Sequence, residues 1–78
     1  MNAKEMRKVI EEKVIDAQKD FRFSLETYGP DDHKTRENAH ASCALDYLYE
    51  DLFGREEFEK LMKKHFPEIF KDQTLRRL

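Results

Sequence analysis

The chain has 78 residues, of which 41% are charged and 38% hydrophobic, and its 15 basic and 17 acidic side chains leave a formal net charge of −2. A chain of this length forms one small domain at most and buries only about 60% of the surface that its unfolded form exposes. The near balance of charge excludes the global basic field of a typical nucleic-acid-binding protein, and the single cysteine excludes an intramolecular disulfide. Oligomerisation is therefore the simplest supplement to so small a core.

The composition favours helix along the whole chain. Two glycines and two prolines leave little material for turns, β-branched residues are few, and good helix formers are plentiful. We therefore predict an all-α fold, a single helical domain over residues 1–78 in which a long antiparallel hairpin is followed by a shorter third helix. We expect the hairpins of two copies to pack into a dimeric four-helix bundle.

The first helix is predicted over residues 3–28. Asn2 and Glu5 have the spacing of a capping box, which predicts a helix start. Gly29 can end the helix with a positive φ, and Pro30 disfavours helix in the residue before it. Hydrophobic residues recur at intervals of three and four along this helix and predict its buried face: Met6, Ile10, Val14, Ala17, Phe21, Leu25 and Tyr28.

The second helix is predicted over residues 33–53, with Asp31 or Asp32 as its amino-terminal cap and Gly54 as its end. The short connection forces the first two helices to run antiparallel. The predicted buried face of the second helix is its main hydrophobic stripe together with three flanking residues: Ala41, Leu45, Leu48 and Leu52, with Ala44, Tyr49 and Phe53.

The third helix is predicted over residues 55–66 and is followed by a short carboxyl-terminal turn over residues 67–78. Glutamates in its first turn and lysines in its last turn match the helix dipole. Its hydrophobic stripe is expected to comprise Phe58, Leu61, Met62 and either His65 or Phe66. Ile69, Phe70 and Leu75 are expected to dock on a hydrophobic surface.

Six phenylalanines and three tyrosines form a larger hydrophobic load than one hairpin and a short helix can bury. Large exposed hydrophobic patches on small proteins mark interfaces, so we expect a non-enzymatic protein-interaction or regulatory module that forms a homodimer. The expected interface residues are Phe23, Cys43, Tyr47, Phe58, Phe66 and Phe70. In the alternative arrangement, the third helix and the tail fold back and bury these aromatic residues. Cys43 is expected to act as a small buried hydrophobic residue and not as a reactive thiol.

Two alternative functions remain open. Glu37 and His40 form a Glu-x-x-His pattern, two copies of which build a di-metal site in four-helix bundles. Glu26 would have to supply the inward glutamate of the first helix, with His33 and Cys43 as additional ligands. An ordinary polar helix face explains the same residues, so we assign no metal site and no cofactor.

The second alternative is a nucleic-acid accessory protein with a basic carboxyl-terminal face. Its candidate phosphate contacts are Lys60, Lys63, Lys64, Lys71, Arg76 and Arg77. The lysines of the third helix can instead pair with glutamates at helical spacing, and no helix-turn-helix pattern is evident. We therefore expect protein partners and no nucleic acid.

The sequence places no serine–histidine or cysteine–histidine pair, so we expect no enzymatic activity and assign no catalytic residue. No hydrophobic run reaches the roughly 18 residues of a membrane span, and no signal-peptide core is present, so we expect a cytoplasmic protein that does not bind membranes. In its overall organisation the chain resembles small helical-hairpin proteins encoded by phages and other mobile elements of Gram-positive bacteria. The resemblance concerns the whole chain and implies no catalytic residues.

Overall fold

A computed structural model describes residues 1–68, which form three helices and no strand. The helices are α1 (Ala3–Tyr28), α2 (His33–Phe53) and α3 (Arg55–His65). The predicted all-α fold, with a long helix pair and a shorter third helix, is therefore confirmed. Most of the predicted carboxyl-terminal turn lies outside the described residues.

Short polar contacts set the ends of the helices. The Asn2 side chain accepts a hydrogen bond from the backbone N–H of Glu5 at 2.8 Å, and the Asp32 side chain accepts one from the N–H of Lys34 at 2.9 Å. Gly29 and Gly54 end α1 and α2 with φ values of 88° and 94°, which residues with a β-carbon rarely adopt. These residues are the expected caps, so local chemistry determines where each long helix begins and ends.

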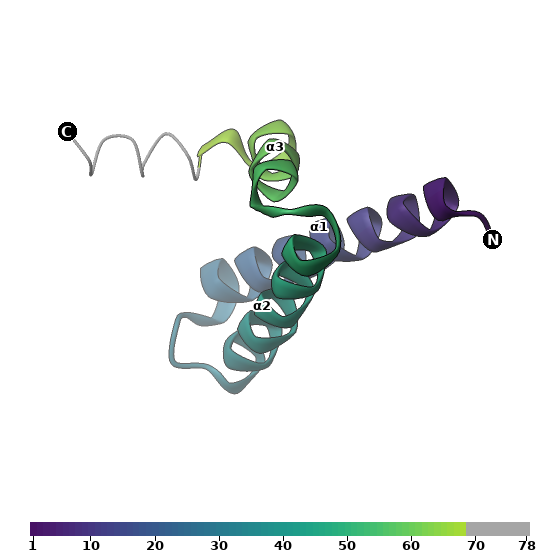
Figure 1. The fold of residues 1–78 in the computed structure, drawn as a ribbon. Coiled ribbons are helices and arrows are strands. Elements are labelled where there is room, and N and C mark those ends of the chain that lie inside the picture. The colour runs from purple at the N-terminus through teal and green to yellow at the C-terminus, as the bar shows by residue number, and fades with distance from the viewer. Residues whose placement is uncertain (69–78) are drawn as a thin grey trace.

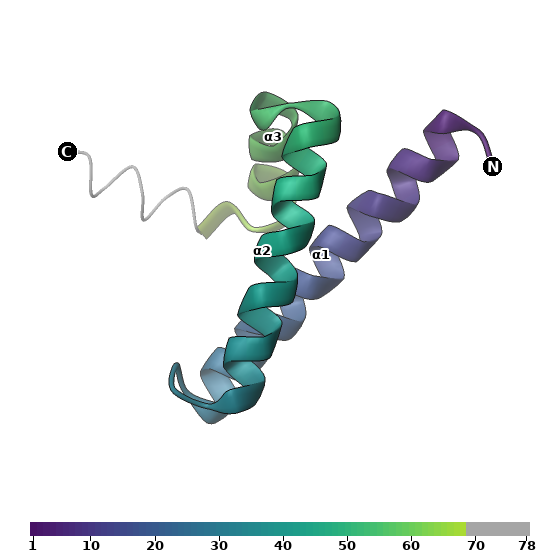
Figure 2. The ribbon, with the colours of Figure 1, turned by 60° about the horizontal axis from the view of Figure 1, so that its bottom comes forward.

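The helices α1 and α2 run antiparallel and diverge from their short turn towards the other end of the molecule (Figure 2). In Figure 1, α3 lies above this pair, against the carboxyl-terminal part of α2. Figure 2 turns the lower side of Figure 1 towards the viewer, and from there α3 lies behind α2 and does not cover the pair. The hairpin therefore has one side that packs against α3 and one side that the described part of the chain leaves open.

The hydrophobic core lies where the three helices meet. Its buried residues are Val14 of α1, Tyr49 of α2, and Leu61, Met62 and Phe66 at the end of the described chain. Partly buried residues surround them: Ile10, Ile15, Leu45, Phe53 and Phe58. The Tyr49 ring packs against those of Phe53 and Phe58, with centroids 4.8 and 6.3 Å away. The third helix and Phe66 therefore contribute most of the buried core residues, and the hairpin contributes only Val14 and Tyr49.

The buried face of α2 differs from the predicted one. Leu48 and Leu52 of the predicted face are 44% and 54% exposed. Tyr49 is buried as predicted, but the other buried residues of α2 are Thr35 and Ser42, at intervals of seven residues before it. Successive helix residues are rotated by about 100°, so Leu48 and Tyr49 cannot both face α1.

Small hydroxyl side chains explain why this polar face is the buried one. The Ser42 hydroxyl donates to the Gln18 side chain at 3.0 Å, and Ser24 of α1 is also buried. The Ser24 and Ser42 hydroxyls each have a hydrogen-bond partner, so their burial carries little penalty, whereas the Thr35 hydroxyl is buried without a partner among the described residues. On α1, Met6, Leu25 and Tyr28 of the predicted face are likewise exposed.

Candidate functional site

The described part of the chain has two surface features of interest. One is a groove between α1 and α3, on the side of the hairpin that carries α3. The other is a patch of exposed hydrophobic residues on the open side of the hairpin. We first describe the groove, because its geometry is the more defined of the two.

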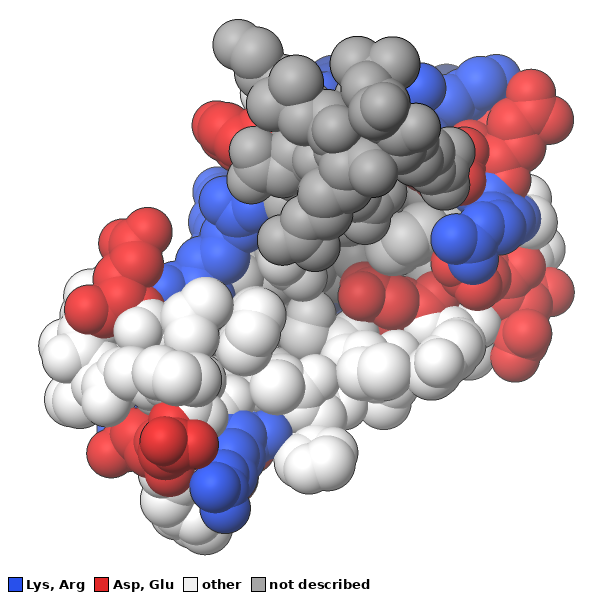
Figure 3. All heavy atoms as spheres, turned by 90° about the vertical axis from the view of Figure 1, so that its left-hand side faces the viewer, with Lys and Arg blue, Asp and Glu red and all other residues white. Residues whose placement is uncertain are grey.

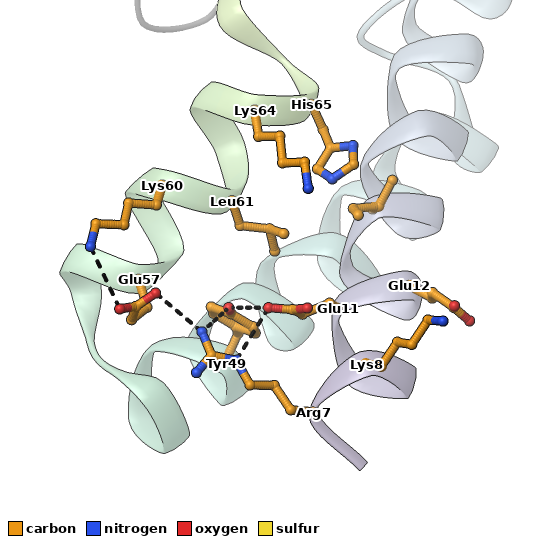
Figure 4. A pocket seen from close by; sticks show the side chains of 11 residues that line it. Arg7, Lys8, Glu11, Glu12, Tyr49, Glu57, Lys60, Leu61, Lys64 and His65 are labelled. Carbon is orange, nitrogen blue, oxygen red and sulfur yellow. Dashed lines mark hydrogen bonds and ion pairs between the residues drawn. The ribbon is translucent and has the colours of Figure 1, made fainter. Parts of the chain in front are cut away.

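The groove has a volume of about 340 Å³, with Tyr49 of α2 in its lining (Figure 4). Arg7, Glu11 and Ile15 line it from α1, and Glu57, Leu61 and Lys64 line it from α3. It exists because α1 and α2 diverge at this end of the molecule, so that α3 bridges them without filling the space completely.

A network of hydrogen bonds at one end of the groove joins all three helices (Figure 4). The Tyr49 hydroxyl donates to Glu11 Oε2 at 2.7 Å. The Arg7 guanidinium donates to Glu11 Oε2 and to the Tyr49 hydroxyl, both at 3.3 Å, and to Glu57 Oε2 at 3.1 Å. It also lies over the Phe53 ring, 4.7 Å from its centroid.

The network keeps its groups in fixed protonation states. Burial raises the pKa of Tyr49, and the hydrogen bond to Glu11 raises it further. Hydrogen bonds to Tyr49 and Glu11 raise the pKa of Arg7. The phenol and the guanidinium therefore both stay protonated at neutral pH and act as hydrogen-bond donors, so the network holds the three helices together.

The opposite end of the groove has basic side chains without such partners. Lys64 and His65 point into the groove from the last turn of α3 (Figure 4). Within residues 1–68, neither of them pairs with a carboxylate. Leu61 and Ile15 lie beside them and give this end a hydrophobic surface.

The residues predicted for the interface do not form one surface. Phe66 is only 5% exposed and Phe58 packs against the core, so both are used inside the chain and are unavailable to a partner in this structure. Cys43 is exposed, which corrects its assignment as a buried residue. Tyr47 lies one turn beyond Cys43 on the same face of α2. Phe23 is exposed on α1, and Phe70 lies outside the described residues.

The Glu-x-x-His pattern lies on a solvated surface. Glu37 accepts a hydrogen bond from His33 Nε2 at 2.8 Å, and the side chains of both residues are largely exposed. His40 and Cys43 are exposed on the same helix. Within the described part of one chain, no three His, Cys, Asp or Glu side chains are grouped closely enough to hold a metal ion.

Four exposed hydrophobic residues lie in the half of the hairpin away from its turn. Leu48 and Leu52 lie one turn apart on α2, and Met6 and Val9 are exposed near the start of α1. The hydrogen bond between Tyr49 and Glu11 fixes the antiparallel register, which brings Leu52 to the level of Val9. We call Met6, Val9, Leu48 and Leu52 the hairpin face.

The turn end of the hairpin carries both charged and uncharged side chains. Figure 3 looks at that end, with the side opposite α3 at the bottom, and shows uncharged side chains across the middle with acidic and basic side chains to the left of them and below them. The hairpin face lies towards the other end of the two helices.

Sequence analysis did not predict the groove or its network. From the sequence, Glu57 is a first-turn residue that is favourable to the helix dipole, and Tyr49 is a flanking residue of a hydrophobic stripe. The one local signal was the spacing of Arg7 and Glu11, four residues apart on one helix face.

Comparison of this protein with family models, curated proteins and solved structures finds no match in any of the three. None of the described helices combines the length and hydrophobicity that a membrane span requires.

Proposed function

We propose that the protein is a non-enzymatic interaction module that forms a homodimer through the hairpin face. One observation carries the proposal. In the described part of the chain, the exposed large hydrophobic residues outnumber the buried ones, and all of them except Met1 lie on the two helices of the hairpin. Isolated exposed hydrophobic residues are ordinary, but a group of them on a small protein is typical of an interface.

A second copy fits this face geometrically. A two-fold axis that lies in the plane between two hairpins brings Leu48 and Leu52 of one copy against the same face of the other. The two hairpins then stack as two helix layers with α3 on each outer side. The pairing is self-complementary because each copy contributes the same residues. Dimerisation thereby supplies the hydrophobic burial that a 78-residue chain achieves only in part.

The expected affinity is modest. Covering the exposed halves of Leu48 and Leu52 on both copies contributes roughly 4 kcal/mol, from which the entropy cost of association is subtracted. Met6, Val9 and the alanines of α2 add further hydrophobic contact. We therefore expect weak association that depends on protein concentration.

Sedimentation velocity over a wide range of protein concentration tests the proposal. We expect a shift from 9.4 kDa at low concentration to twice this mass at high concentration. Leu48→Glu should raise the dissociation constant at least about tenfold, because it buries a charge without a partner.

Tyr47→Glu is the matched control. Tyr47 is exposed on the same helix, one residue away and about 100° round it. This substitution should leave the dimer intact. A wild-type monomer at all concentrations, or a dimer that is lost with Tyr47→Glu and not with Leu48→Glu, would refute the assignment of the hairpin face.

A further inference from the structure

We infer that the groove between α1 and α3 is a second docking site, independent of the hairpin face, for a partner segment that carries both glutamate or aspartate and aliphatic side chains. The groove lies on the side of the hairpin that carries α3, so a dimer formed through the hairpin face leaves it accessible. The inference rests on the distribution of charge and hydrophobic surface inside the groove.

Two of the three acidic groups that line the groove are compensated by the chain itself. Glu11 accepts hydrogen bonds from Arg7 and Tyr49. Glu57 accepts one from Arg7 and lies 3.7 Å from the Lys60 ammonium. The third acidic group, Glu12, lies one turn from Lys8 on α1, so these two opposite charges offset each other at the rim.

Lys64 forms no ion pair within residues 1–68, and His65 lies beside it. Lys64 projects over the space between α3 and α1 (Figure 4). A carboxylate in that space would gain an ion pair with Lys64 and could accept a hydrogen bond from His65. The residual field of the groove therefore favours an anionic ligand.

The lining beneath Lys64 favours a peptide over a small inorganic anion. Leu61 and Ile15 form the adjoining wall, and the Tyr49 ring lies below the network. An aliphatic side chain placed there buries hydrophobic surface next to the ion pair. The pre-formed network keeps Arg7 and Glu57 in place, so little ordering is required when the segment binds.

The test uses the full-length protein and a fluorescein-labelled, end-capped synthetic peptide of alternating glutamate and leucine pairs. Fluorescence anisotropy measures its affinity, and amide chemical shifts of ¹⁵N-labelled protein locate the contact. We expect the largest shifts at Leu61 and Lys64. A matched peptide with glutamine in place of glutamate should bind about fivefold more weakly, which is the effect of losing a solvent-accessible ion pair.

Lys64→Glu should weaken binding of the glutamate peptide about tenfold, because it replaces an attraction with a repulsion. Lys19→Glu makes the same charge change on an exposed residue of α1 that does not line the groove, and it should leave the affinity within about twofold. If Lys64→Glu does not fold, as judged by circular dichroism, then Lys64→Gln replaces it, with an expected loss of about fivefold.

Three results would overturn the inference. The first is the absence of amide shifts in the groove at saturating peptide. The second is an equal loss of affinity with Lys64→Glu and Lys19→Glu, which would indicate general electrostatic attraction. The third is tighter binding of a labelled DNA duplex than of the peptide, with the same dependence on Lys64.

Discussion

Replacing Asp46 with asparagine is expected to stabilise the protein at neutral pH. Asp46 is partly buried on α2, one turn before Glu50, and its Oδ1 atom is buried with no hydrogen-bond partner among the described residues. Burial and the neighbouring Glu50 carboxylate raise the pKa of Asp46 from 3.8 to about 6. The folded protein therefore holds a negative charge there at pH 7 in an unfavourable environment.

The pKa shift fixes the sign of the pH dependence. Because the pKa of Asp46 is higher in the folded state than in the unfolded state, the folded state binds its proton more tightly. The destabilising effect is absent below about pH 4, grows between pH 4 and pH 6, and is fully present at pH 7. Each pKa unit corresponds to about 1.4 kcal/mol. Since solvent still reaches the carboxyl group, we discount the full shift of about 3 kcal/mol to roughly 1–2 kcal/mol.

Urea denaturation followed by circular dichroism at pH 7 and pH 5 measures this effect, at one fixed protein concentration because association also changes stability. Asp46→Asn should unfold at higher urea than the wild type at pH 7, and the difference should shrink at pH 5. Taking the difference between variant and wild type cancels the contribution of the other carboxylates. Asp51→Asn, at an exposed position of the same helix, is the control and should show no such difference. A variant that is less stable than the wild type at pH 7, or a difference that does not change with pH, would refute this explanation.

Three further substitutions test the packing. Tyr49→Phe removes the hydroxyl that donates to Glu11 and should lower the free energy of unfolding by about 1–2 kcal/mol, as measured by urea denaturation. An unchanged urea midpoint would mean that the network adds no stability. In Gly54→Ala the new β-carbon meets no steric obstacle, but the alanine must adopt a φ of 94°. The free energy of unfolding should therefore fall by roughly 1–3 kcal/mol in the same assay, and an unchanged value would argue against this turn geometry. Leu48→Ala should lower the free energy of unfolding by less than about 1 kcal/mol at concentrations where the protein is monomeric, and by more only where it is dimeric. A large loss of stability in the monomer would show that Leu48 belongs to the core.

The helix ends could be predicted because adjacent residues determine them. Asn2 and Asp32 need only a backbone N–H two or three residues away, and Gly29 and Gly54 need only their own dihedral angles. Each signal is complete within about five residues of sequence. The all-α class followed from the same local preferences, summed along the chain.

The helix faces could not be predicted in the same way. Hydrophobic periodicity assumes that a helix turns its most hydrophobic side inwards, whereas α2 buries Thr35 and Ser42 and exposes Leu48. Which face of α2 is buried depends on the side chains of the neighbouring helix that can contact it and form hydrogen bonds with it. Here these side chains are Gln18 and Ser24 of α1, which bond to Ser42 and Asn38. The groove is still less accessible to sequence analysis, because its network joins residues up to 50 positions apart.

The connection between α2 and α3 consists of a single residue, Gly54. The direction in which α3 leaves α2 therefore depends on two backbone torsions, with no linker to absorb a change in either. A rotation of a few tens of degrees there would carry Leu61 and Met62 away from Val14 and Tyr49, opening the core and removing one wall of the groove in the same movement. The packing of the core and the shape of the groove therefore both depend on the backbone conformation of Gly54, so a substitution that changes this conformation changes the two together.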